Sequence, residues 1–192
     1  GGVTSAIETL TEPGDCVLLH SPVYVGFSAD VDMLGRRSIY SPLTKDENGI
    51  YRMDFDDMER KIEKHHIHAM IMCSPHNPTG RVWERGELER VAELCRKHDV
   101  FIISDEIWSD IILDENRHIP MQSVSEDAKQ RTAAFYAPSK TFNLAGLVGS
   151  YHIIYNGWLR DRVLKESSLS HYNSMNVLSM YALIGAYRPE GH

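Results

Sequence analysis

The segment APSKTFNLAGL, residues 137–147, places a single lysine, Lys140, in a Pro/Ser turn between two apolar runs. The run before it, residues 133–136, is typical of a buried strand, so the amine of Lys140 should lie at a strand end. A lysine presented in this way can form a Schiff base with a carbonyl group. A Ser-Lys pair considered alone is more often part of a surface loop.

Two further segments place polar residues directly after strand-like runs. The turn SPHNPTG, residues 74–80, follows an apolar run, and Asp105 follows the apolar run 100–103. Ligands bind at the carboxyl ends of strands in open α/β sheets. The sequence therefore predicts that Asn77, Asp105 and Lys140 lie together at one edge of a sheet.

These segments resemble those of the fold-type I pyridoxal phosphate (PLP) enzymes of the aminotransferase class I/II superfamily. The family's Asn-Pro-x-Gly turn, strand-ending Asp and Ser-Lys pair occur here in the family's order. The resemblance implies an α/β fold of the PLP-dependent transferase (aspartate aminotransferase-like) type, with a mostly parallel, seven-stranded sheet flanked by helices. It covers nearly the whole chain, and family members are longer. Residues 1–192 are thus expected to be the large, PLP-binding domain, without the N-terminal arm and the C-terminal small domain.

The resemblance also assigns a role to each central residue. Lys140 would carry PLP, Asn77 would donate to its phenolic oxygen, and Asp105 would bind the pyridine nitrogen. A buried carboxylate beside that cation stays ionised and keeps the ring protonated, so that the ring withdraws electrons from the substrate. The adjacent Glu106 should point to the opposite side of the strand end, so the two carboxylates should not act on one atom.

The first residues are predicted to begin a helix whose free N–H groups suit a phosphate. An ordinary N-cap is the commoner meaning of such a pattern, but Gly2, Val3 and Thr4 match the family's phosphate-binding loop. Tyr24 follows a predicted parallel strand, residues 16–19. By resemblance, its ring would stack on the pyridine ring of PLP.

The chain departs from the commoner aminotransferase pattern at three positions. Trp108 stands where most members have a tyrosine that also binds the phenolic oxygen. Ala137 and Val148 stand where they have a phosphate-binding serine and arginine. The phosphate therefore has fewer identified partners, and we expect Ser139, with residues outside this chain, to contribute.

Apolar periodicity predicts several other elements. They include a helix ending near residue 34, a strand over 37–43, a turn at residues 48–49 and a helix that Asp54 caps. Another helix, over 84–98, should bury its apolar side. Five charged residues of that helix are predicted to form a solvated face: Glu87, Glu89, Arg90, Glu93 and Arg96.

The composition is that of an ordinary globular protein, with 42% hydrophobic and 24% charged residues. A formal net charge of −7, with scattered basic residues, argues against a nucleic-acid partner. No apolar run approaches the roughly eighteen residues of a membrane span, and the N-terminus does not resemble a signal peptide. A cytoplasmic location without a membrane partner is therefore expected.

The cysteines and histidines give no metal-binding pattern. The chain has three cysteines: Cys16, Cys73 and Cys95. They lack CxxC spacing and lie in apolar contexts, which predicts buried, reduced thiols. The histidines of residues 65–68 have no carboxylate or cysteine nearby to complete a tetrahedral set, so surface histidines are expected and no metal.

The combined motifs look most like the C–S β-lyase branch of the superfamily, the MalY/PatB type. Such an enzyme cleaves cystathionine or other cysteine S-conjugates to thiol, pyruvate and ammonia. Lys140 would remove the substrate Cα proton, because it is neutral and positioned over that carbon once the substrate amine has displaced it from PLP.

Two alternatives stay open, because lyase and aminotransferase share their first steps. One is an amino-acid aminotransferase, and the other is a regulatory domain that senses PLP without catalysis. The arginine that would bind the substrate carboxylate is not identifiable, since Arg160, Arg162 and Arg188 match no family position. By resemblance the protein is a homodimer whose subunits share each site, so the fragment alone would have weak activity or none.

Overall fold

The computed structural model describes residues 1–169 and 174–191. Its main sheet has the strand order β2-β1-β5-β6-β7-β8, and all neighbours are parallel except β7 and β8. The strands are β1 (Cys16–Ser21), β2 (Arg37–Pro42), β5 (Ala69–Cys73), β6 (Phe101–Asp105), β7 (Thr132–Tyr136) and β8 (Tyr151–Ile153). The predicted α/β fold with a mostly parallel sheet is confirmed.

The strand count differs from the expectation. The described residues supply six strands to the main sheet, not seven. The number seven is what the family resemblance implies, and the sequence pattern assigned no residues to a seventh strand. A separate antiparallel hairpin joins β3 (Thr44–Lys45) to β4 (Tyr51–Arg52). Its turn contains Asn48 and Gly49, as predicted, and Gly49 has a φ of 76° that favours glycine.

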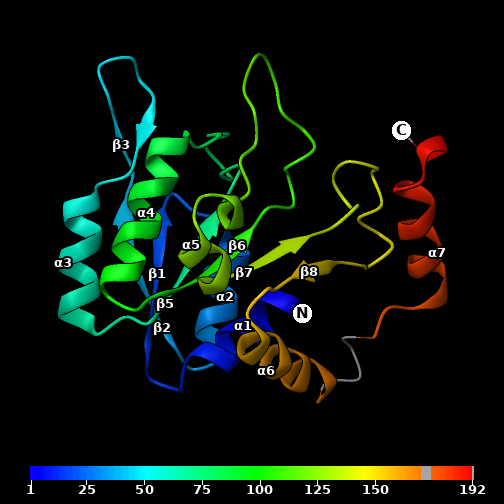
Figure 1. Ribbon diagram of the computed structural model, residues 1–192, viewed down its shortest axis with the longest axis horizontal. Helices are drawn as coiled ribbons and strands as arrows, with labels where there is room; N and C mark the ends of the chain where they lie inside the picture. Colours follow the sequence, from blue (N-terminus) through cyan, green and yellow to red (C-terminus); the bar gives the residue numbers. More distant parts are fainter. Residues whose placement is uncertain (170–173, 192) are drawn as a thin grey trace.

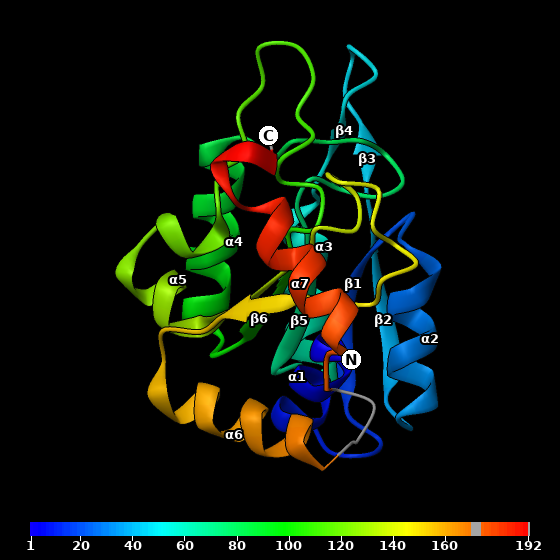
Figure 2. The ribbon, with the colours of Figure 1, turned by 90° about the vertical axis from the view of Figure 1, so that its right-hand side faces the viewer.

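Helices cover both faces of the main sheet (Figures 1 and 2). The helices are α1 (Gly2–Leu10), α2 (Val25–Met33), α3 (Phe55–His65), α4 (Arg85–Lys97), α5 (Glu126–Arg131), α6 (Gly157–Ser168) and α7 (Val177–Ala186), with 3-10 turns η1 (Met121–Ser123) and η3 (Pro189–Gly191). Side chains of α3, α4 and α5 pack on one face, and those of α1, α2 and α6 on the other. Because successive strand residues face opposite layers, Leu18 joins the first core and Leu19 the second. Both faces therefore need apolar residues, which explains the unbroken apolar runs.

The predicted helix boundaries hold to within one or two residues. Asp54 caps α3, with its side chain accepting from the Asp57 N–H at 2.9 Å. The three cysteines are buried and unpaired, as predicted. Of the predicted surface histidines, His66 and His68 are exposed and His65 is half-buried. Among the residues described, no helix has the length and apolar character to traverse a bilayer.

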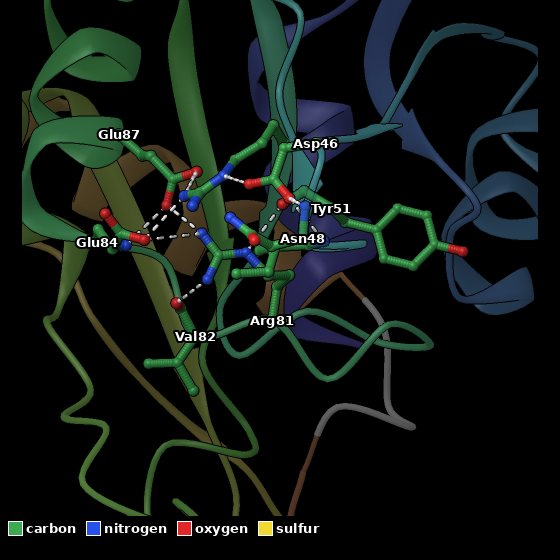
Figure 3. A network of polar contacts seen from close by, with 9 residues as sticks. Asp46, Asn48, Tyr51, Arg81, Val82, Glu84 and Glu87 are labelled. Carbon is green, nitrogen blue, oxygen red and sulfur yellow. Dashed lines mark hydrogen bonds and ion pairs between the residues drawn. The ribbon is translucent and has the colours of Figure 1, made fainter.

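The prediction of a wholly solvated face on α4 is wrong for Glu87. The Glu87 side chain is only 13% exposed and forms an ion pair with Arg81 (Figure 3). It forms a second ion pair with Arg52. Arg81 also donates to the Tyr51 carbonyl at 2.9 Å, which ties the β3–β4 hairpin to the start of α4. Helical periodicity could not predict this, because Arg52 approaches from a distant hairpin. Arg90 also departs from a purely solvated role, since its guanidinium lies 3.9 Å from the ring centre of Phe55.

Helix α7 lies beyond β8, at one end of the molecule (Figure 1). It exposes several large apolar side chains: Val177 (62%), Leu178 (72%), Met180 (44%), Tyr181 (68%) and Ile184 (42%). Tyr187, just after the helix, contacts the rings of Phe142 and Tyr151 at centre distances of 5.4 and 5.7 Å. Helix α7 thus has an apolar surface that the described residues leave uncovered.

Candidate active site

The carboxyl ends of four parallel strands bring the predicted site residues together. Tyr24 follows β1, Asn77 follows β5, Asp105 ends β6 and Lys140 follows β7. Two cavities, of about 190 and 220 Å³, meet here, and Tyr24 and Asp105 line both. The first is also lined by Asn77, Trp108, Ser139 and Lys140, and the second by Gly2 and Val3.

Thr4 is the one predicted site residue that lines neither of these two cavities. Its hydroxyl is hydrogen-bonded to Asp30, which lines the second cavity. Burial raises the pKa of Asp30, and the Thr4 hydrogen bond partly offsets that effect. No local sequence pattern marks Asp30 as a site residue.

Asp105 is a carboxylate whose hydrogen bonding is incomplete. Its Oδ1 accepts from the Ile107 N–H at 3.0 Å, and Oδ2 accepts from no group in residues 1–169 or 174–191. Burial raises its pKa to about 6, while the Ile107 hydrogen bond and the positive charge of Lys140 act in the opposite direction. A cationic N–H donor in the cavity would satisfy Oδ2 and stabilise the ionised form.

Asn77 lies in a turn fixed by backbone hydrogen bonds. The Gly80 N–H donates to the His76 carbonyl at 2.7 Å, and the His76 N–H donates to the Arg81 carbonyl at 2.8 Å. Gly80 has a φ of 72°, where glycine is preferred. The Asn77 N–H contacts Cys73 Sγ at 3.4 Å. Its side-chain amide lines the first cavity and has no hydrogen-bond partner among the described residues.

Lys140 lies in a compact loop and remains exposed. Backbone bonds from Phe142 to Pro138 (3.0 Å) and from Leu144 to Ser139 (3.1 Å) close the loop. Its Nζ lies 5.3 Å from the centre of the Trp108 ring, a cation–π distance. Its amine is therefore accessible at the edge of the cavity, as the sequence predicted.

The N-terminus of α1 approaches the end of β7 closely. A Cβ atom on Gly2 would lie 2.7 Å from the Phe135 ring, so only glycine fits there. Tyr24 caps α2 and packs edge-on against Phe27, with ring centres 5.4 Å apart. Tyr24 lines both cavities and is 48% exposed, so part of its side chain remains accessible from them.

Sequence reasoning missed several residues at this edge. Phe27 and Ile107 line both cavities, and Cys73 lines the first. Burial raises the pKa of the Cys73 thiol to about 12, so it is not nucleophilic at neutral pH. Glu106 is fully buried on the other side of the β6 end, as alternation predicted. The polar groups that surround it come from positions up to 30 residues away, which no local pattern reveals.

The fold and the gathered strand-end residues define an α/β protein of the PLP-dependent aminotransferase fold. The chain belongs to the aminotransferase class I and II family, whose model matches residues 1–184.

Its relatives include C–S lyases. The chain is 37% identical over 189 residues to cystathionine beta-lyase PatB of Bacillus subtilis (98% of this chain, 49% of PatB). Cystalysin of Treponema denticola, solved with pyridoxal 5'-phosphate, superposes with a TM-score of 0.92 and 35% identity (99% of this chain, 48% of cystalysin). The PLP-bound C–S lyase of Staphylococcus hominis gives a TM-score of 0.88 at 36% identity (99% and 47%). The chain thus spans about half the length of the relatives it matches.

Proposed function

We propose that this chain is the PLP-binding large domain of an enzyme that cleaves cystathionine or other cysteine S-conjugates to thiol, pyruvate and ammonia. The observation that carries the proposal is the convergence of Lys140, Asp105 and Asn77 on one cavity beside Tyr24. The C–S lyases among the similar proteins support this choice of reaction.

The side chains present fit PLP. The free Oδ2 of Asp105 suits a pyridinium N–H, and the unpaired Asn77 amide suits a phenolic oxygen. Tyr24 offers a ring face, and Lys140 offers the amine. Gly2 and Val3 of the second cavity and Ser139 of the first would hold the phosphate, whereas Thr4 lines neither cavity and its phosphate role rests on the resemblance alone. Trp108 would pack beside Lys140. When bound, PLP supplies an electron sink for the negative charge that develops on the substrate Cα.

The residues of this chain would then act in sequence. Lys140, in its neutral form, would take the Cα proton. Asp105 would stay ionised and so hold the ring nitrogen in its protonated, electron-withdrawing form. The electron pair left on Cα would form a Cα=Cβ double bond as the Cβ–S bond breaks with its own pair on sulfur, and the sulfur would take up one proton and leave as the thiol. Hydrolysis of the remaining three-carbon fragment gives pyruvate and ammonia.

An aminotransferase is the second candidate, supported by the family description itself. It would use the same residues up to proton removal and would return the proton to the cofactor instead of expelling sulfur. A PLP-sensing regulatory domain is the third candidate, in which Lys140 binds the cofactor without turnover.

The experiment is done on the full-length protein loaded with PLP. L-Cystathionine is added without a keto acid, and pyruvate and free thiol are followed. Many turnovers of pyruvate with matching thiol support the lyase. A single conversion that continues only when a keto acid is added identifies an aminotransferase. No conversion in either assay, with PLP still bound, supports the sensing domain.

We further propose a cytoplasmic homodimer. Three buried, unpaired thiols suit a reducing compartment, which supports the cytoplasmic location.

The dimer is supported by helix α7, whose exposed apolar side chains suit contact with a further surface, such as a second subunit. Light scattering of the full-length protein tests the dimer, and a monomer at micromolar concentration would contradict it.

A further inference from the structure

Glu106 directly follows Asp105, is fully buried and lines neither active-site cavity. Four polar groups surround its carboxylate: Ser104 Oγ (2.9 Å) and the Met121 N–H (3.1 Å) at Oε1, and the Tyr136 hydroxyl (2.8 Å) and His118 Nε2 (2.7 Å) at Oε2. A buried carboxylate with this many partners is held in one orientation. The four contacts are more than Glu106 would need only to end strand β6, which indicates a further role of this carboxylate.

The contacts of Glu106 close the base of a long loop, residues 107–120. The loop starts at Glu106, and its far end returns to the same carboxylate through His118 and Met121. Inside it, the Ser109 N–H donates to the Glu106 carbonyl at 3.0 Å, and this turn contains Trp108. The position of Trp108 therefore depends on how Glu106 is held.

The same loop contacts the Lys140 loop at two consecutive residues. The Trp108 ring lies 5.3 Å from Lys140 Nζ. The Thr141 hydroxyl donates to Asp110 Oδ2 at 3.0 Å. A continuous set of contacts thus runs from the buried Glu106, through its loop, to the reactive amine.

We infer that Glu106 is a positioning residue that fixes Lys140 through the loop of residues 107–120. It acts through Trp108 and Asp110 and touches neither substrate nor cofactor. The inference rests on the proposed role of Lys140 as the PLP-binding lysine. A purely structural Glu106 would change global stability and leave the Lys140 loop as it is.

The test uses full-length Glu106→Gln, which removes the negative charge and makes the two groups at one of the oxygens face an NH₂ donor in place of an acceptor. Glu115→Gln is the matched control, because Glu115 is exposed in the same loop and the charge change is the same. In the coenzyme-free protein, amide hydrogen exchange in segments 107–120 and 138–147 should be at least about tenfold faster in Glu106→Gln. Exchange in β1 and β5 should match the wild type. With PLP bound, the pH midpoint of its visible absorbance should shift in Glu106→Gln and not in the control.

A second variant covers the case in which Glu106→Gln does not fold. Thr141→Val removes only the exposed hydroxyl that contacts Asp110, and it should accelerate exchange in 138–147 alone. A folded Glu106→Gln with wild-type exchange in both segments and an unshifted absorbance midpoint would overturn the inference, as would unchanged exchange in Thr141→Val. If wild-type protein treated with PLP and borohydride carries no label on Lys140, the proposed function fails instead.

Discussion

A buried histidine pair should make the folded state less stable in mild acid. His20, near the end of β1, and His76, after β5, have ring centres 6.4 Å apart, beside Trp83. The Nε2 atoms of both rings are buried and have no hydrogen-bond partner among the residues described. Burial lowers the pKa of His20 to about 3, helped by His76, and lowers the pKa of His76 to about 4.

The magnitude follows from proton linkage. A histidine in the unfolded chain has a pKa of about 6.5, so at pH 5 it binds a proton that the folded protein excludes. Each residue should then reduce the free energy of unfolding by about 2 kcal/mol between pH 7.5 and pH 5, or about 4 kcal/mol for the pair. This is a large part of the roughly 5–15 kcal/mol that stabilises a typical domain. The contribution of the two neutral histidines to stability is fully present above the pKa of histidine in the unfolded chain, and it is lost as the pH falls below that pKa.

Asp105 acts in the opposite direction in the coenzyme-free protein. Its folded pKa of about 6 lies above the unfolded value of about 3.9, so the folded state binds a proton between these values. This should add about 1 kcal/mol of stability at pH 5 relative to pH 7.5. The expected net loss for the three groups is therefore about 3 kcal/mol.

The assay is urea unfolding of the full-length, coenzyme-free protein, followed by circular dichroism at the two pH values. His20→Gln and His76→Gln should each reduce the pH-dependent loss by about 2 kcal/mol. They are compared with His68→Gln, an exposed control that should leave the loss unchanged. The reasoning is refuted if both buried-site variants lose as much stability as the wild type on acidification.

Three further predictions concern the site and its support. Lys140→Ala should lower turnover at least about 10³-fold and abolish the borohydride-stable PLP label, as mass spectrometry of the peptide would show; a retained label would contradict the assignment. Gly2→Ala should cost about 1–3 kcal/mol in urea unfolding through its clash with Phe135, and wild-type stability would refute the close approach. Glu87→Gln, which weakens the pairing with Arg81, should cost about 1.5–3 kcal/mol, whereas the exposed Glu89→Gln should change little; equal effects would show that the network is not stabilising.

Much of the fold followed from local pattern. Continuous apolar runs identified the parallel strands because both sheet faces are covered, and Asp54 marked a helix start because it caps one. The grouping of Asn77, Asp105 and Lys140 was predictable for a simple reason. In a parallel sheet all carboxyl ends lie at one edge, so residues that follow strands meet there however far apart they are in sequence.

Other features could not be predicted because they depend on tertiary contacts. Glu87 has the helical position of a solvated residue, yet Arg52 and Arg81 converge on it. The sequence shows His76 only as part of the turn of residues 74–80, and the fold places it beside His20. In both cases the partner comes from another element. The charge pattern and periodicity of the segment around Glu87 or His76 therefore cannot reveal the contact.

Asp105 and Glu106 show how neighbouring, chemically similar residues acquire different properties. Strand alternation sends Asp105 to the cavity side, where one N–H donates to it and burial raises its pKa. Glu106 faces the interior, where four polar groups surround it. A carboxylate with an acceptor to spare can bind a cationic ligand, whereas one with all its acceptors engaged can only hold protein segments together. The proposed roles, cofactor binding for Asp105 and positioning for Glu106, are therefore consistent with the opposite directions of the two side chains and with the partners on each side of the strand end.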